Sequence, residues 1–198
     1  MRRVRAGVSV LGELLITAGV VLLLFVVWQL GYVALVDSRA QASVVGELEQ
    51  QFAQATLAPS EPPGAAGAEP PAADLANGAV FAILRVPRLG GSSWAKPVYE
   101  GVGASTLAKG LGHYPDSQLP GQVGNTAIAG HRAGHGNPLI DIDAIKPGDV
   151  MVVETGDAYA VYRAERSQIV PPTQVDVIAP VPGQPGATPT KAYLTLTS

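Results

Sequence analysis

Three histidines are the side chains of this 198-residue sequence best suited to acid/base or metal chemistry: His113, His131 and His135. Imidazole titrates near neutral pH, so it serves both as a general acid or base and as a metal ligand. His131 follows the short apolar stretch 124–130, whose composition predicts a buried strand that ends just before the histidine. His131 is therefore the leading candidate for catalysis. The alternative is a structural histidine that caps the end of a strand.

A metal site built on His131 and His135 is the weakest of the candidate sites. The two residues are four positions apart, and Asp141 and Asp143 lie nearby in the sequence. That spacing binds zinc when both histidines share one helix face. Glycines on both sides of His135 disfavour a helix, and no glutamate follows His131. A metal hydrolase thus ranks last, and we expect neither a metal nor another cofactor.

A histidine that acts as a base needs a nucleophile to activate. The sequence contains no cysteine, which excludes disulfides, cysteine-ligated metals and thiol chemistry within these residues. Ser198 is the last residue, and a terminal serine beside a free carboxylate has no ordered oxyanion site. We therefore do not expect Ser198 to act as the nucleophile.

The overall composition favours a β-rich domain and argues against a nucleic-acid partner. The formal charge is -3 with a pI near 5.5, whereas nucleic-acid-binding domains are usually basic. Glycine (23) and proline (17) are frequent, while charged residues make up only 15% of the chain. This mixture is typical of short strands joined by many turns, together with a flexible linker.

The composition of the first 36 residues predicts a membrane anchor. Residues 1–13 carry three arginines, and residues 14–36 form an uncharged, almost wholly apolar run. A helix over that run would be roughly 35 Å long, enough to cross a bilayer core of about 30 Å. The positive-inside rule then places residues 1–13 in the cytoplasm and the rest outside, in a single-pass protein of the cell membrane. A signal peptide cleaved near residues 40–42 is the alternative.

Residues 37–79 connect this segment to the rest of the chain. Val44, Val45, Leu48 and Phe52 recur at helical spacing, which predicts a juxtamembrane helix. Residues 57–79 contain five prolines among alanine, glycine and glutamate. Such a composition cannot bury a core, so we expect an extended spacer there.

Residues 80–198 are predicted to form one all-β domain, a barrel or a sandwich. Proline and glycine turns separate short runs of apolar, β-branched and aromatic residues. Single helical turns are expected over 105–110 and within 137–145. The expected strands cover residues 80–86, 96–100, 125–129, 150–154, 158–164, 167–170 and 192–197.

Two of these stretches, in this order, resemble the signature motifs of one enzyme family. Residues 126–132 (Thr-Ala-Ile-Ala-Gly-His-Arg) look like the histidine motif of sortases, the cysteine transpeptidases of Gram-positive cell surfaces. Residues 194–198 (Leu-Thr-Leu-Thr-Ser) resemble the strand that precedes the sortase cysteine. Residues 112–115 and 169–173 are similar to class E sortases of actinobacteria. The resemblance covers about residues 78–198.

The resemblance implies an eight-stranded sortase barrel, incomplete because the last strand or strands are missing. The catalytic cysteine would be the residue after Ser198, and the transition-state arginine would lie one strand further on. Both are absent from the 198 residues, so these residues alone are expected to be inactive. The alternative is a non-catalytic, membrane-tethered module that binds the same peptide.

For the complete enzyme, the resemblance implies cleavage between Thr and Gly of a Leu-Ala-x-Thr-Gly or Leu-Pro-x-Thr-Gly sorting signal. His131 would protonate the departing glycine amine and later accept a proton from the incoming amine. Tyr114 and His113 would lie where the family selects its substrate. The implied partners are surface proteins with C-terminal sorting signals and an amine acceptor, such as a peptidoglycan precursor.

Overall fold

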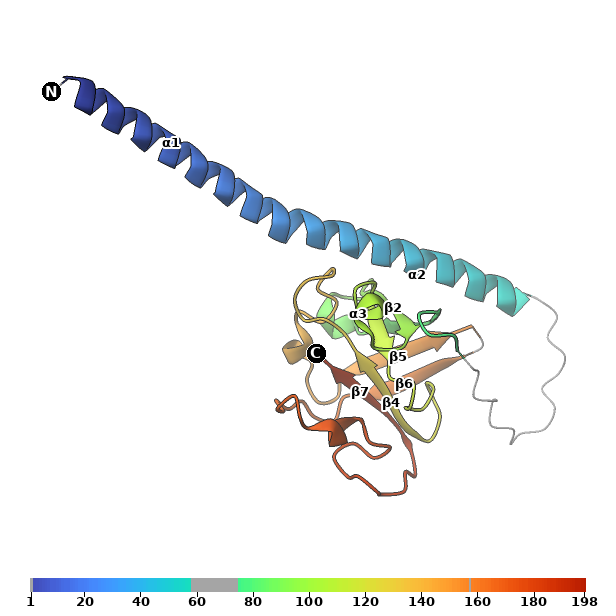
Figure 1. Ribbon diagram of the computed structural model, residues 1–198. Coiled ribbons are helices and arrows are strands. Elements are labelled where there is room, and N and C mark those ends of the chain that lie inside the picture. The colour runs from blue at the N-terminus through green and yellow to red at the C-terminus, as the bar shows by residue number, and fades with distance from the viewer. Residues whose placement is uncertain (1, 58–74, 157) are drawn as a thin grey trace.

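The computed structural model describes residues 2–57, 75–156 and 158–198. Most of the predicted proline-rich spacer, residues 58–74, lies outside these ranges. The described part contains a long N-terminal helical segment and a seven-stranded sheet that curves into a nearly closed barrel. Figure 1 shows the first helix extending away from the sheet and the next helix running across one side of it. The all-β prediction for the C-terminal part is thereby confirmed.

The helical segment consists of α1 (Arg2–Val27), a π-helical turn (Trp28–Tyr32) and α2 (Val33–Leu57). The apolar run of residues 14–36 is therefore divided among three consecutive helical elements and does not form one uninterrupted α-helix. Among the described residues, no helix combines the length and the apolar character needed to cross a bilayer. The predicted localisation, a single-pass protein of the cell membrane with its catalytic domain outside, is therefore wrong.

The barrel begins with β1 (Val80–Arg85) and β2 (Ala95–Glu100), which are antiparallel neighbours. A short α3 (Ala104–Leu107) leads to β3 (Leu111–His113), which pairs parallel to β2 and antiparallel to β4 (Gly124–Ala129). Three further strands follow β4: β5 (Val150–Thr155), β6 (Tyr159–Arg163) and β7 (Ala192–Thr197). Short 3-10 turns lie between β1 and β2 (Pro87–Leu89), between β4 and β5 (Ile142–Ala144) and between β6 and β7 (Val175–Ile178).

The strand order across the sheet is β6-β5-β1-β2-β3-β4-β7. The last pair, β4 and β7, is parallel, although more than 60 residues separate the two strands in the sequence. The strand predicted over residues 167–170 does not form. Ile169 in that segment is fully exposed, at 104% of its reference area, so no neighbouring strand covers it.

The core fills the barrel interior and a second, smaller cluster lies outside it. Ala82 and Leu84 of β1 point inward, toward Val98, Leu111 and Ile128. The intervening Ile83 points to the opposite face, as alternate residues of a strand do, and is also completely buried. It is covered by Val44, Val45, Leu48 and Phe52 of α2. The helix therefore covers the outer face of the sheet at β1 and β2.

A bidentate ion pair joins the turn after β1 to the turn before β5. Arg88 Nε and Nη2 donate to the two carboxylate oxygens of Asp149 at 2.7 and 2.8 Å. The backbone N–H of Lys146 donates to the same carboxylate at 2.8 Å. The Arg88 hydrogen bond, followed by that of Lys146, lowers the pKa of Asp149 to about 2.

This pair predicts an acid-dependent contribution to stability. Because the folded pKa lies below the unfolded value of about 3.9, the stabilisation is complete above roughly pH 4 and is lost as the pH falls toward 2. Arg88→Gln should therefore destabilise the protein relative to wild type at pH 6. That difference should shrink at pH 2.5 in urea unfolding followed by circular dichroism. An equal difference at both pH values would show that the pair is not responsible.

Candidate active site

His131 lies just beyond the end of β4, the strand that is buried along its whole length. β3 pairs with β4 on one side and β7 pairs with it on the other. The parallel register sets Ala129 opposite Thr197, and the ladder continues one step further, because the N–H of Gly130 donates to the Thr197 carbonyl at 3.0 Å. The sheet thereby brings the segment that carries His131 next to the end of β7.

Gly130 allows this segment to pass close to the core. A Cβ atom at position 130 would overlap Leu111 Cδ2 and would lie 2.9 Å from Leu139 Cδ1. Both leucines are completely buried, so they have no free space into which to move. The glycine before the histidine is therefore a packing requirement. The backbone of His131 is also fixed, since its carbonyl accepts a hydrogen bond from the Leu139 N–H at 3.1 Å.

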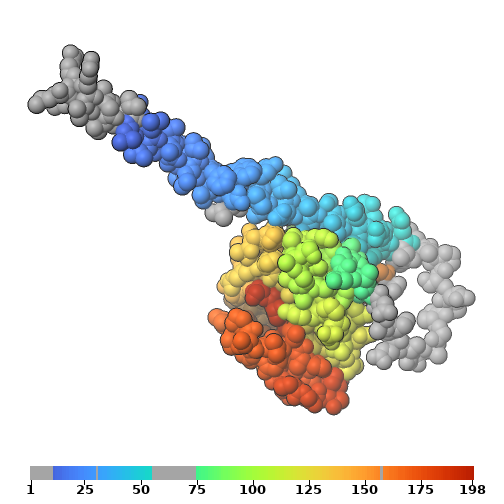
Figure 2. Space-filling view, in the orientation of Figure 1, coloured from blue at the N-terminus to red at the C-terminus, as the bar shows by residue number. Residues whose placement is uncertain are grey.

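A pocket of about 290 Å³ opens where β4 and β7 end. Figure 2 shows the red C-terminal residues recessed between the yellow and lime segments on one side and the orange segment on the other. His131 is partly exposed here. The pocket is lined by Leu107, Tyr114, Ala129, Gly130, His131, Arg132, Thr197 and Ser198.

Tyr114 is another residue that lines this pocket. Its backbone N–H donates to the Ala127 carbonyl at 3.0 Å, which continues the pairing between β3 and β4. Its hydroxyl shares a 3.4 Å hydrogen bond with the Thr197 hydroxyl. The side chain thus links β3 to the end of β7 across the pocket.

His113 lies elsewhere, inside the barrel wall. His113 is only 1% exposed, and its side chain pairs with that of Glu100, which is 6% exposed. His113 Nδ1 lies 2.8 Å from Glu100 Oε2, and its Nε2 contacts the Ser117 hydroxyl at 3.0 Å and the Gln118 carbonyl at 3.1 Å. Both ring nitrogens are engaged within the protein, and His113 does not line the pocket that holds His131.

His135 lies beside His131, with 4.7 Å between the two ring centroids. It does not create a metal site. Among the described residues, no group of three or more His, Cys, Asp or Glu side chains is placed to hold a metal ion. Asp143 instead accepts a hydrogen bond of 2.6 Å from Arg132 Nη2.

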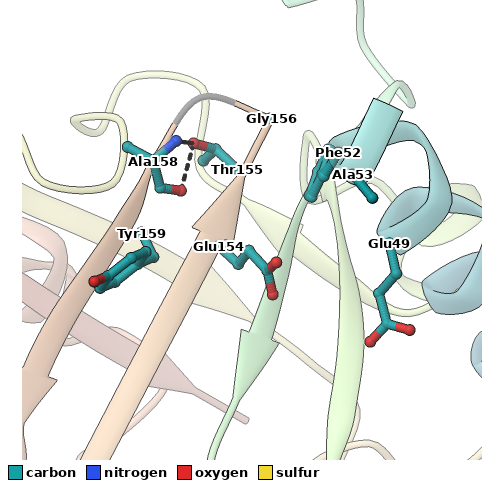
Figure 3. Close-up of a pocket in the computed structure, with 8 residues that line it drawn as sticks. All are labelled: Glu49, Phe52, Ala53, Glu154, Thr155, Gly156, Ala158 and Tyr159. Atoms are coloured by element: carbon teal, nitrogen blue, oxygen red, sulfur yellow. Dashed lines mark hydrogen bonds between the residues drawn. The ribbon is translucent and has the colours of Figure 1, made fainter. Parts of the chain in front are cut away.

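A larger cavity of about 580 Å³ lies between the end of α2 and the β5–β6 hairpin. Figure 3 shows Phe52 and Ala53 of α2 on one side of it and Thr155 and Ala158 of the hairpin on the other. Three of its polar side chains are already paired within the chain: Glu49 and Glu154 both bind Arg85, and the Thr155 hydroxyl binds the Ala158 carbonyl. These pairings leave the smaller pocket, with its histidine and tyrosine, as the better candidate for catalysis.

The sequence did not point to the polar residues that support the site from behind. Glu100, Gln41 and Ser38 are ordinary polar residues in sequence, and no motif singles them out. Their partners are up to 98 residues away. The one available signal was the position of Gln41 on the same helical face as Val45 and Leu48, which places it toward the core.

The sequence matches the sortase domain over residues 84–198. It is 36% identical over 197 residues to Sortase SrtE1 and 35% identical over 201 residues to Sortase SrtE2, both of Streptomyces coelicolor. The matches cover 95% and 97% of this chain but 51% and 75% of those two proteins. The chain thus spans about half the length of the first relative and three quarters of the second.

The fold agrees with the sequence comparison. The structure of sortase E from Streptomyces avermitilis matches with a TM-score of 0.57 at 42% identity, and the match covers 62% of this chain and 81% of that one. The predicted resemblance to class E sortases and the predicted sortase-like barrel are confirmed. The matched residues 84–198 include β4, β7 and the residues that line the pocket at their ends.

Proposed function

Because this chain belongs to the sortase family, we propose that its pocket is the acid/base half of a cysteine transpeptidase site. The substrate is a sorting signal of the Leu-Ala-x-Thr-Gly or Leu-Pro-x-Thr-Gly type, cleaved between Thr and Gly. The observation that carries this proposal is the parallel register of β4 and β7. It sets Ala129 opposite Thr197, and two further steps along both strands set His131 opposite the position after Ser198.

A thiol at that position gives His131 a partner. The thiolate attacks the carbonyl carbon of the threonine, and a thioester replaces the Thr–Gly amide bond. His131 donates its proton to the departing glycine amine. In the second half, His131 accepts a proton from the incoming amine, which attacks the thioester and releases the thiolate. The family also supplies an arginine, which holds the substrate and stabilises the developing negative charge on the carbonyl oxygen.

Tyr114 is the residue of this chain that we propose to contact the sorting signal. It lines the pocket, and its ring stands between β3 and the end of β7. For His113 we propose a structural role, because it is only 1% exposed and both of its ring nitrogens form hydrogen bonds within the protein. The partners are then surface proteins that carry the sorting signal and an acceptor amine such as a peptidoglycan precursor.

The experiment requires a chain with the missing thiol. We define the extended chain as residues 1–198 followed by a cysteine and an arginine-bearing strand, the order that the sortase family implies. Incubated with a fluorescent Leu-Ala-x-Thr-Gly peptide, it is expected to release a fragment that begins with glycine. The matched control has serine in place of the added cysteine and should release none. Cleavage by the serine control, or cleavage at another bond, would overturn the proposal.

A non-catalytic peptide-binding module is the second candidate. It is favoured by one observation: the pocket with His131 and Tyr114 is already formed within the described residues. On this alternative, the 198-residue chain binds the labelled peptide in fluorescence polarisation. The extended chain then binds it equally well without cleaving it.

A further inference from the structure

Helix α2 reaches the turn that follows His131. Its middle part, around Val45 and Leu48, packs on the outer face of β1. One and two turns earlier along the helix, Gln41 and Ser38 lie against residues 135 and 136. A segment almost 100 residues away in the sequence thus touches the loop that carries the proposed acid/base residue.

Gln41 makes the central contact. The residue is only 2% exposed, and its Nε2 donates to the His135 carbonyl at 2.9 Å. Its Oε1 accepts a hydrogen bond of 3.0 Å from Lys96 Nζ on β2. Only this orientation of the amide satisfies both neighbours, since a carbonyl oxygen only accepts and an ammonium group only donates. Gln41 therefore bridges the barrel wall and the turn.

Ser38 and a glycine complete the contact. The Ser38 hydroxyl donates to the Gly136 carbonyl at 3.1 Å. A Cβ atom at position 136 would lie 2.9 Å from Gln41 Nε2 and 3.1 Å from the Ser38 backbone nitrogen. The turn approaches the helix so closely that there is no space for a side chain at this position.

The turn itself has a backbone conformation that needs outside support. Gly134, His135, Gly136 and Asn137 have φ values of 80°, 50°, 75° and 49°. A left-handed conformation is unfavourable for residues with a Cβ atom and persists where the surrounding structure enforces it. Within the turn, Asn137 Oδ1 accepts a bond from the Gly134 N–H at 2.6 Å. The contacts with Gln41 and Ser38 provide the support from outside.

We propose that Gln41 is a positioning residue for His131. It holds the His135 carbonyl, the turn keeps its left-handed conformation, and the His135 ring stays packed 4.7 Å from the His131 ring. The inference rests on the proposed catalytic role of His131, which it deepens. It assigns to α2 a part in the active site, in addition to its packing on β1.

The test uses the 198-residue chain, and its readout does not depend on catalytic activity. The chain has three histidines, so the ring Cε1–Hε1 region of a ¹H–¹³C spectrum contains three signals, assigned by single His→Gln variants. Gln41→Glu keeps the size of the side chain and its acceptor for Lys96 but replaces the donor to the His135 carbonyl with a carboxylate. The His135 and His131 signals are expected to shift, and the buried His113 signal is expected to stay in place.

The matched control is Glu49→Gln, the reverse exchange two helical turns later on α2. It weakens the ion pair with Arg85, whose Nη2 lies 2.6 Å from Glu49 Oε1, and leaves Gln41 intact. All three histidine signals should then remain in place. If Gln41→Glu also displaces the His113 signal because the fold is lost, Ser38→Ala provides the milder test. Unchanged His131 and His135 signals in whichever variant stays folded would overturn the inference.

Kinetic measurements on the extended chain distinguish a failure of this inference from a failure of the proposed function. In the extended chain, Gln41→Glu is expected to lower kcat by up to about 10²-fold, the cost of displacing a catalytic group by about 1 Å, with KM unchanged. Gln41→Asn, which keeps a shorter amide donor, should restore part of that loss. If the extended chain is inactive, the proposed function fails, while the histidine signals still decide the role of Gln41.

Discussion

Replacing His131 with asparagine in the extended chain is expected to lower kcat/KM for a sorting peptide by about 10²–10⁴-fold, the usual contribution of a general acid or base. Asparagine retains a polar side chain of similar reach but cannot transfer a proton at neutral pH. The departing glycine amine then leaves without a proton donor. The loss should appear mainly in kcat, because His131 is one of several residues that line the pocket.

The matched control for this prediction is His135→Gln. The two rings are neighbours, with centroids 4.7 Å apart, so both exchanges disturb the same local packing. Only one of the two residues lines the pocket, and that is His131. We expect a smaller loss for His135→Gln than for His131→Asn. The exchange removes the ring packed beside His131 but keeps the proton donor itself. Equal losses in the two variants, or a larger loss for His135→Gln, would mean that the acid/base role belongs to another residue.

Glu100→Ala is expected to lower the free energy of unfolding by about 1–3 kcal/mol, the range for leaving a buried hydrogen-bonding group without its partner. Glu100 and His113 are 6% and 1% exposed, and the pair joins the end of β2 to the end of β3. Without Glu100, His113 Nδ1 remains in the barrel wall without its partner. Urea unfolding followed by tryptophan fluorescence measures the change.

A double-mutant cycle separates the pair from simple loss of packing. Glu100→Leu with His113→Leu removes the two partners of this hydrogen bond together, so the double variant should lose less stability than the two single variants added together. The Phe81 ring, which contacts His113 edge to face with 5.6 Å between centroids, then packs against leucine. Additive losses would show that Glu100 and His113 act independently.

Strands with a strong local signal could be predicted from the sequence. The hairpin over residues 150–154 and 158–164 corresponds to β5 and β6, because a polar turn separates two runs rich in β-branched and aromatic residues. The same reasoning failed at residues 167–170. An apolar, β-branched composition fits a strand, but a strand also needs a partner, and Ile169 in this segment is fully exposed.

The pairing of β4 with β7 could not be derived from local patterns. Ala129 and Thr197 are partners, yet nothing in either stretch specifies the other. It was the resemblance to sortases that placed the two motifs in one site. The same limit applies to Glu100 and His113, whose burial depends on the register between β2 and β3.

The N-terminal segment shows how a composition-based prediction fails and what it missed. The apolar run of residues 14–36 suggested one membrane-spanning helix, whereas α1 ends at Val27 and a π-helical turn separates it from α2. The helical spacing of Val45 and Leu48 indicated an amphipathic helix but not the surface that it covers. That surface includes the turn after His131. Only the tertiary contacts of Gln41 and Ser38 show that the helix reaches this turn.

The central claim is that His131 and the position after Ser198 form one active site, and the mass of the enzyme–peptide adduct tests it most directly. In the incubation of the extended chain with the sorting peptide, the intact protein should gain the mass of the peptide up to and including threonine. Hydroxylamine should remove this mass, as it does from a thioester. The adduct should be absent when the added cysteine is replaced by serine and strongly reduced by His131→Asn. An adduct that forms equally well without His131, or a mass that includes the glycine, would contradict the account.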